Sequence, residues 1–105
     1  MCNYTHEATL RWTWDPNKAA ANRAKHGLSF ETAAHVFDDP FHASKPDPQS
    51  DGDRWHTIGL VGPVLILVIH TWPEAEFEDE EPAGRIISAR KATAHERRAY
   101  EEGDF

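Results

Sequence analysis

The chain has a single cysteine, Cys2, among its 105 residues, so no disulfide can form within it. This is typical of a protein from a reducing compartment. A long apolar run is also missing, because the longest one covers residues 64–69 and a membrane helix needs about 20 residues. The first residues, MCNYTHEATL, lack both the basic and the apolar region of a secretory signal. We therefore expect a soluble, cytoplasmic protein with no membrane partner.

Several catalytic and cofactor motifs are missing as well. The chain has no glycine-rich phosphate loop, no Gly-x-Ser-x-Gly and no His-Glu-x-x-His. Its seven histidines are scattered, without the spacing of a zinc site. We therefore expect neither a metal nor a cofactor, and the terminal Cys2 is a poor candidate for a nucleophile.

The charged residues that are present are unevenly distributed. The net charge of −7 argues, taken alone, against a nucleic-acid partner. Six of the acids, however, lie within residues 74–81 (EAEFEDEE). The C-terminal quarter is instead rich in cations: Arg85, Arg90, Lys91, Arg97 and Arg98. An acidic segment beside a basic one leaves a region that can bind an anionic partner.

The N-terminal half predicts one strand and two helices. Residues 9–14 (TLRWTW) alternate between apolar and polar, as in a half-buried strand. A helix should begin after Asp15, a good capping residue, and end at Gly27. A second, shorter helix (FETAAHVF) is expected over residues 30–37. Residues 40–53 are rich in Pro, Asp, Ser and Gly, which predicts a loop.

The C-terminal half predicts three strands and a last helix. Residues 54–60 and 64–72 form a hairpin through a Gly-Pro turn, and the second of these strands is apolar enough to be covered on both faces. An acidic loop over residues 74–84 precedes a strand at 85–89. Thr93 and the glutamate three residues later match a capping box that starts the final helix.

These elements predict a single α+β domain over residues 1–105, with residues 1–8 flexible. Consecutive strands with short turns favour a small antiparallel sheet of about four strands. Two helices from the N-terminal half and one C-terminal helix would pack against it.

The hairpin carries the first group of candidate site residues. If the turn centres on residues 62–63, facing residues have numbers that sum to about 126. His56 then lies opposite His70, with Arg54 and Trp72 further along the same face, and facing side chains lie about 5 Å apart. Such a group can bind phosphate or transfer protons. The alternative is an edge of unrelated polar residues, and a slip of one residue would move His70 to the other face.

The first helix carries a second group. Lys18, Asn22 and Lys25 are spaced by four and three residues, so they share one helix face, and His26 lies next to them. The alternative is an ordinary solvated surface, since exposed lysines are common and a histidine in the last turn is stabilised by the helix dipole.

The C-terminal segment RIISARKATAHERRAY carries a third group. Arg85 and Arg90 flank the predicted strand, and Lys91 follows them. Glu96 and Tyr100 occupy neighbouring turns of the last helix. The planar guanidinium of arginine suits phosphate and stays charged at all relevant pH values.

Four segments together resemble the BrnT family of type II toxin–antitoxin ribonucleases: WDPNKAAANRAKHGLSFETAAHVFDDP, RWHTIGLVG, LVIHTW and RIISARKATAHERRAYEEG. The resemblance covers about residues 12–102, and the pairing of the KHG segment with the RIISAR segment is specific. The chain departs from the family in its acidic stretch at 74–81, in Pro73, and in Gly84, where an aliphatic residue is usual.

The resemblance implies a RelE-like fold and RNA cleavage that inhibits translation. It also implies a partner, a BrnA-like antitoxin that binds DNA as a repressor. The toxin would form either a dimer or a heterotetramer with this antitoxin. The edge strand at residues 9–14 is where such a partner could add a strand or helix. The motif positions that carry over are Lys25, His26, Arg54, His70, Arg85, Arg90, Glu96 and Tyr100.

The resulting hypothesis is an endoribonuclease that needs no metal and in which the ribose 2′-hydroxyl attacks the adjacent phosphate. His70 or His26 would transfer protons, Arg54, Arg85 and Arg90 would stabilise charge, and Lys25 could serve either purpose. Supporting or RNA-binding roles fall to Lys18, His56, Lys91, Glu96 and Tyr100. The alternative is a binding module without catalysis, acting only as the partner of a DNA-binding repressor.

Overall fold

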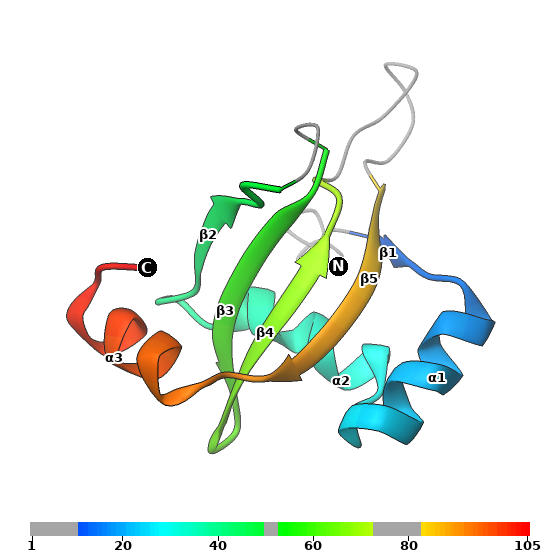
Figure 1. The fold of residues 1–105 in the computed structure, drawn as a ribbon, viewed down its shortest axis with the longest axis horizontal. Coiled ribbons are helices and arrows are strands. Elements are labelled where there is room, and N and C mark those ends of the chain that lie inside the picture. The colour runs from blue at the N-terminus through cyan, green and yellow to red at the C-terminus, as the bar shows by residue number, and fades with distance from the viewer. Residues whose placement is uncertain (1–10, 50–52, 73–82) are drawn as a thin grey trace, which may run out of the picture.

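A computed structural model describes residues 11–49, 53–72 and 83–105 of the chain. A five-stranded sheet runs through it in the order β1-β5-β4-β3-β2 (Figure 1). The strands are β1 (Arg11–Thr13), β2 (Ala43–Pro46), β3 (Trp55–Val61), β4 (Val64–His70) and β5 (Ala83–Lys91). The helices are α1 (Pro16–His26), α2 (Phe30–Ala33), the 3₁₀ helix η2 (Ala34–Asp38) and α3 (Ala94–Glu102). The α+β class is therefore confirmed.

The sheet differs from the prediction in two ways. Its fifth strand, β2, lies inside the region 40–53 that was predicted to be a loop. A strand of four residues that includes a proline gives too little alternation to be recognised, and proline is tolerated here because β2 is at the sheet edge. The sheet is also not wholly antiparallel, because β1 pairs with β5 in the parallel sense.

Helix α1 begins and ends where the sequence predicted, and α3 begins at its predicted capping box. Asp15 caps α1 by accepting a hydrogen bond from the backbone N–H of Asn17, and Gly27 ends it with φ 72°. Thr93 and Glu96 form the predicted capping box of α3. The second helix is different: only four residues are α-helical, and the chain continues as the 3₁₀ helix η2.

Two expectations concern segments outside the described residues: the flexible residues 1–8 and the acidic stretch 74–81. The predicted loop 74–84 was too long, because Ala83 and Gly84 already belong to β5. No helix in the described part of the chain is long and apolar enough to cross a membrane.

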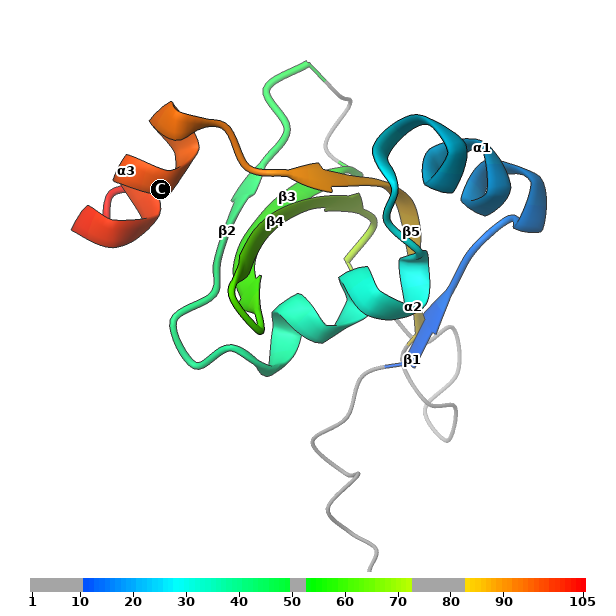
Figure 2. The same ribbon diagram turned by 90° about the horizontal axis from the view of Figure 1, so that it is seen from below.

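The central strand β4 is buried on both faces, as its apolar sequence predicted. We call the face against α2 and η2 the back face, because these helices lie behind the sheet in Figure 1 and the sheet curves around them in Figure 2. The opposite face is the front face. Helix α1 lies beside β5, and α3 lies at the other side of the sheet, near β2 and β3.

The back face holds the larger part of the core. Phe30 and Val36 from the helices pack with Ile66, Val68 and Ile86 from the sheet, and all five are almost fully buried. Burying an aliphatic or aromatic side chain of this size contributes about 1.5–3 kcal/mol, so this cluster is the main source of stability.

The front face has a smaller core at the end covered by α3. Ile58, Leu65 and Leu67 are buried there, and Tyr100 and Phe105 from the C-terminal segment pack against them. The remainder of the front face has no such apolar cover among the described residues. The polar side chains of β2, β3 and β5 can therefore reach solvent there.

Candidate functional site

The register of the hairpin differs by one residue from the prediction. His56 pairs with Ile69, and His70 pairs with Trp55, so facing residue numbers sum to 125. Because side chains alternate along a strand, this slip places His56 on the front face and His70 on the back face. The expected pair of facing histidines was wrong. Trp72, expected beside Arg54, has its ring against Trp55 and His70 instead.

His70 is fully buried behind the sheet. Its Nε2 lies 2.7 Å from Thr57 Oγ1, and its Nδ1 lies 2.7 Å from the carbonyl oxygen of Thr71. The rings of Trp12 and Phe37 meet it edge-on at 5.2 Å. Burial lowers the pKa of His70. The structure therefore places this predicted proton-transfer residue in the interior, as a neutral, hydrogen-bonded core histidine.

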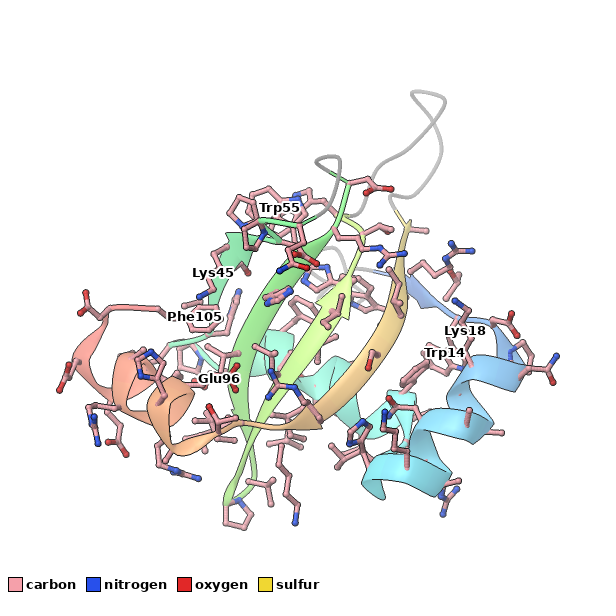
Figure 3. The ribbon with its side chains drawn as sticks, viewed as in Figure 1. Trp14, Lys18, Lys45, Trp55, Glu96 and Phe105 are labelled. Atoms are coloured by element: carbon pink, nitrogen blue, oxygen red, sulfur yellow. The ribbon has the colours of Figure 1, made fainter. Side chains whose placement is uncertain are left out.

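A row of four side chains, three of them polar, crosses the front face through His56. The register aligns Lys45, His56, Ile69 and Ser88 across four strands. The Lys45 ammonium lies 4.4 Å from the centroid of the Phe105 ring, a contact that Figure 3 shows at the C-terminal side of the sheet. The row thus runs from the C-terminus of the chain to β5.

Asp47 lies next to this row. Its Oδ2 is 3.4 Å from His56 Nε2, and both side chains are about one-fifth exposed, 18% for Asp47 and 20% for His56. Asp47 Oδ1 also accepts a hydrogen bond from the backbone N–H of Gln49 at 2.9 Å. This hydrogen bond, together with His56 and Arg54, keeps the pKa of Asp47 below its usual value.

Arg54 and Arg85 are both exposed, at the same end of the sheet. The carbonyl of Arg54 accepts a hydrogen bond from the Asp47 N–H at 2.9 Å, which extends the pairing of β2 and β3 by one residue. Arg54 therefore follows the alternation that places His56 on the front face. Arg85 lies between two buried residues of β5, Gly84 and Ile86, so it too faces the front.

Arg90 is on the front face but is already paired. Its guanidinium makes two hydrogen bonds of 2.8 Å to the two carboxylate oxygens of Glu96. This pair lowers the pKa of Glu96 to about 2. Lys91, the next residue, is exposed on the opposite face, where the register aligns it with Ile66. The predicted run of C-terminal cations is thus divided between the two faces.

Helix α1 contributes a groove beside β5. A shallow hollow of about 290 Å³ is lined by residues of the predicted helix stripe and of the strand: Lys18, Ala21, Asn22, Lys25, His26, Ile87 and Ser88. Lys18 marks the α1 side of the molecule in Figure 3, away from Lys45. We call this hollow the α1 groove.

Asn22 fixes the α1 groove to the sheet. Its buried side-chain amide donates to the carbonyl of Ala89 at 2.9 Å and accepts from the N–H of the same residue at 3.1 Å. The hydroxyl of Ser88 also donates to the Asn22 carbonyl oxygen, at 3.2 Å. Asn22 therefore completes the open edge of β5, and its neighbours Lys25 and His26 are held at a defined place beside Ser88.

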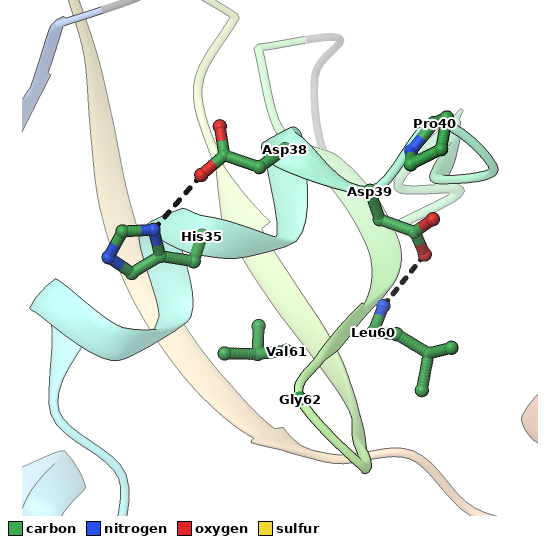
Figure 4. Close-up of a pocket in the computed structure, with 7 residues that line it drawn as sticks. All are labelled: His35, Asp38, Asp39, Pro40, Leu60, Val61 and Gly62. Atoms are coloured by element: carbon green, nitrogen blue, oxygen red, sulfur yellow. Dashed lines mark hydrogen bonds and ion pairs between the residues drawn. The ribbon is translucent and has the colours of Figure 1, made fainter.

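A second hollow, of about 420 Å³, lies beside η2 and the hairpin turn (Figure 4). Asp39 lines it, but its carboxylate already accepts hydrogen bonds from the Leu60 N–H at 2.8 Å and from the Tyr100 hydroxyl. Burial and this bond to Asp39 raise the pKa of Tyr100 to about 12. Tyr100 therefore serves to hold α3 in place, and this hollow offers no lysine or arginine for a phosphate.

Sequence reasoning missed Lys45 and Asp47. Both lie in the region 40–53 that was predicted to be a loop, so nothing placed them beside His56. The only local signal was their position shortly before the predicted strand at 54–60. Among the described residues, no group of three His, Cys, Asp or Glu side chains is arranged to hold a metal ion.

No curated protein matches the chain at a significant level. The family model of the ribonuclease toxin BrnT, of type II toxin–antitoxin systems, matches residues 14–96. The matched segment includes the α1 groove and the charged residues of the front face, and it gives no support to a binding module without catalysis. In type II systems each toxin is paired with an antitoxin. Because the match covers most of the length of the chain, the chain belongs to the BrnT family of ribonuclease toxins.

Proposed function

We propose that this protein is an endoribonuclease that cleaves RNA without a metal ion and thereby inhibits translation, and that its front face binds the RNA. One observation carries the proposal: Arg54, His56 and Arg85 share the front face, beside the α1 groove with its Lys25 and His26. The front face and the α1 groove thus offer cations that can bind phosphate and imidazoles that can transfer protons.

The reaction that suits these groups is attack by the ribose 2′-hydroxyl on the adjacent phosphorus. A base takes the hydroxyl proton, the 2′-oxygen forms a bond to phosphorus, and the bond to the 5′-oxygen breaks. The leaving 5′-oxygen takes up a proton. The products are a 2′,3′-cyclic phosphate and a 5′-hydroxyl, and general acid–base groups accelerate such a step by about 10²–10⁴-fold.

The roles follow from accessibility. Arg54 and Arg85 are exposed and stabilise the extra negative charge on the phosphate. Lys25 or His26 protonates the leaving oxygen from the α1 groove. Arg90 is held by Glu96, so we assign it to the shape of the front face rather than to direct charge stabilisation.

His70 takes a role other than the predicted one because of where it lies, whereas Lys18 keeps its predicted role. His70 supports the hairpin from behind, through Thr57 and Thr71, and its side chain is fully buried, so we assign it no direct role in the reaction. Lys18 contributes to phosphate attraction at the α1 groove. The antitoxin, a DNA-binding repressor, would silence the toxin by covering the front face, which excludes RNA from the same surface.

The test is to incubate the purified, antitoxin-free protein with total RNA, with and without EDTA, and to analyse the fragment ends. We expect cleavage that survives EDTA and leaves 2′,3′-cyclic phosphates. Arg85→Ala should reduce the rate by about 100-fold, as loss of one charge-stabilising group does in other enzymes. Arg23→Ala is the matched control, because Arg23 is an exposed α1 arginine that lines a different hollow, with Trp14.

Three results would overturn the proposal. One is a folded protein that leaves RNA intact. The second is cleavage that EDTA abolishes, which would indicate a metal nuclease. The third is equal loss of activity in Arg23→Ala and Arg85→Ala, which would separate the activity from the front face.

A further inference from the structure

We propose that His56 is the base that removes the 2′-hydroxyl proton, and that Asp47 is its positioning residue. This rests on the proposed ribonuclease function and names the group that the reaction still requires. His56 lies on the open front face in the row between Lys45 and Ile69, whereas His70 is enclosed behind the sheet.

The contact between the two side chains has a defined geometry. His56 Nε2 and Asp47 Oδ2 are 3.4 Å apart. The Asp47 carboxylate is held in place by the Gln49 N–H, and the Asp47 backbone is held by the Arg54 carbonyl. Because β2 and β3 are paired up to Asp47 and Arg54, the carboxylate cannot move far from the imidazole.

His56 Nε2 is buried and makes no hydrogen bond. Buried polar atoms are nearly always hydrogen-bonded, and an exception calls for an explanation. Here the atom faces the Asp47 carboxylate at 3.4 Å, without the geometry of a hydrogen bond. A ring that takes a proton from RNA becomes positively charged, and that charge then meets Asp47. The arrangement is therefore better suited to the protonated imidazole that forms in the reaction than to the resting one.

The other charged groups around His56 do not cancel the attraction between Asp47 and the protonated ring. Lys45, its neighbour on β2, has its ammonium over the Phe105 ring. Arg54, two residues before His56 in the chain, is exposed to solvent. His70, on the adjacent strand, has a pKa lowered by burial and is neutral. Asp47 is thus the group in direct contact with the ring.

The proton transfer balances as follows. The 2′-hydroxyl gives its proton to Nδ1 of His56, the ring nitrogen that does not face Asp47, while its oxygen bonds to phosphorus. The bond from phosphorus to the 5′-oxygen breaks, and that oxygen takes a proton from Lys25 or His26 of the α1 groove. Exchange with water then removes the proton from His56 and restores the one lost from the α1 groove.

A second His–Asp contact in the chain provides a matched control. His35 Nδ1 lies 3.0 Å from Asp38 Oδ2, three residues along η2, and Figure 4 shows the pair at the rim of the second hollow. These side chains are 66% and 79% exposed, and they belong to η2, which covers the back face of the sheet. His35→Ala removes the same chemical group from a place that the proposal does not involve.

The test compares cleavage of a defined RNA by the full chain and its variants. We expect His56→Ala to lose about 100-fold or more in kcat, and added imidazole to restore part of it. Asp47→Asn should lose about tenfold in kcat with little change in KM, and the acid limb of its pH–rate profile should move to lower pH. Asp47→Glu should regain part of the loss, and His35→Ala should cleave like the wild type.

The outcomes separate this proposal from the proposed function. If the wild type does not cleave RNA, the ribonuclease function itself fails. If the wild type cleaves but His56→Ala matches it, or loses activity that imidazole cannot restore, then His56 is not the base. An unchanged pH–rate profile in Asp47→Asn would overturn the positioning role. If His56→Ala does not fold, His56→Gln keeps the volume of the side chain and serves in its place.

Discussion

The two faces of the sheet give their histidines different environments, although His56 and His70 lie on adjacent strands. On the back face, His70 has a hydrogen-bond partner for each ring nitrogen and aromatic rings around it. On the front face, His56 has a buried nitrogen without a hydrogen bond and an incomplete contact to Asp47. The back face thus satisfies its polar groups and stabilises the fold, whereas the front face leaves groups available for chemistry.

The largest effect on stability that this comparison predicts is that of His70→Ala. The substitution opens a cavity among Trp12 and Phe37, and it removes a hydrogen-bond partner from Thr57 and from Thr71. We expect a loss of about 3 kcal/mol in the free energy of unfolding. His56→Ala, on the open face, should lose less than about 1 kcal/mol.

Chemical denaturation of both variants measures this difference. Equal losses would mean that the two faces do not differ in their contribution to stability. The fraction of His70→Ala that remains folded should still cleave RNA at the wild-type rate. A folded His70→Ala without activity would return His70 to the catalytic site.

A smaller effect on the back face is expected from Gly84→Ala. A Cβ at this position would lie 2.5 Å from Cζ3 of Trp12 and 3.1 Å from the carbonyl oxygen of Thr71. Trp12 cannot retreat easily because its ring stacks on Phe37 at 4.4 Å. We expect a loss of about 2 kcal/mol in the free energy of unfolding, the usual size of an overpacking effect.

A double-mutant cycle tests the cause of that loss. In a Trp12→Leu background, the same Gly84→Ala change should cost clearly less, because the atom that it meets is gone. Additive losses would contradict the clash with Trp12. The contact also gives a physical reason for glycine at position 84: Gly84 pairs with Trp12 across β1 and β5, and the indole occupies the space that a Cβ would need.

Much of this fold could be predicted because its signals are local. Asp15, Gly27 and Thr93 cap helices through atoms within four residues, and the apolar run of β4 marks the centre of the sheet on composition alone. The one signal for β2 was not local. Its four residues are held by pairing with β3, which no short window of sequence contains.

The site depended on a single register, and that is where the prediction failed. A turn at residues 62–63 allows facing numbers that sum to either 125 or 126, and the choice decides which histidine reaches the front face. The structure favours 125 because His70 then enters the aromatic cluster of Trp12 and Phe37. Both rings come from segments distant in sequence, so the hairpin alone could not reveal the preference.

A further change in stability is predicted for the front face, and it depends on pH. Glu96 has a pKa of about 2 in the folded protein, against the usual 4.5, mainly because of its hydrogen bonds to Arg90. The folded state therefore holds this proton more weakly than the unfolded state does. The stabilisation is fully present above about pH 4.5 and is lost as the pH falls towards 2.

Glu96→Gln should lose about 1–2 kcal/mol at pH 7, an amount that allows for solvent screening at the partly exposed Arg90. The difference between the variant and the wild type should shrink as the pH falls to 3 and below, as measured by denaturation at each pH. A difference that stays constant would mean that the capping hydrogen bonds of α3, rather than the charge on Glu96, stabilise this end of the front face. The same substitution frees Arg90, so the rate of RNA cleavage should not fall along with the free energy of unfolding. A parallel fall in both would place the Arg90–Glu96 pair itself among the groups that the reaction uses.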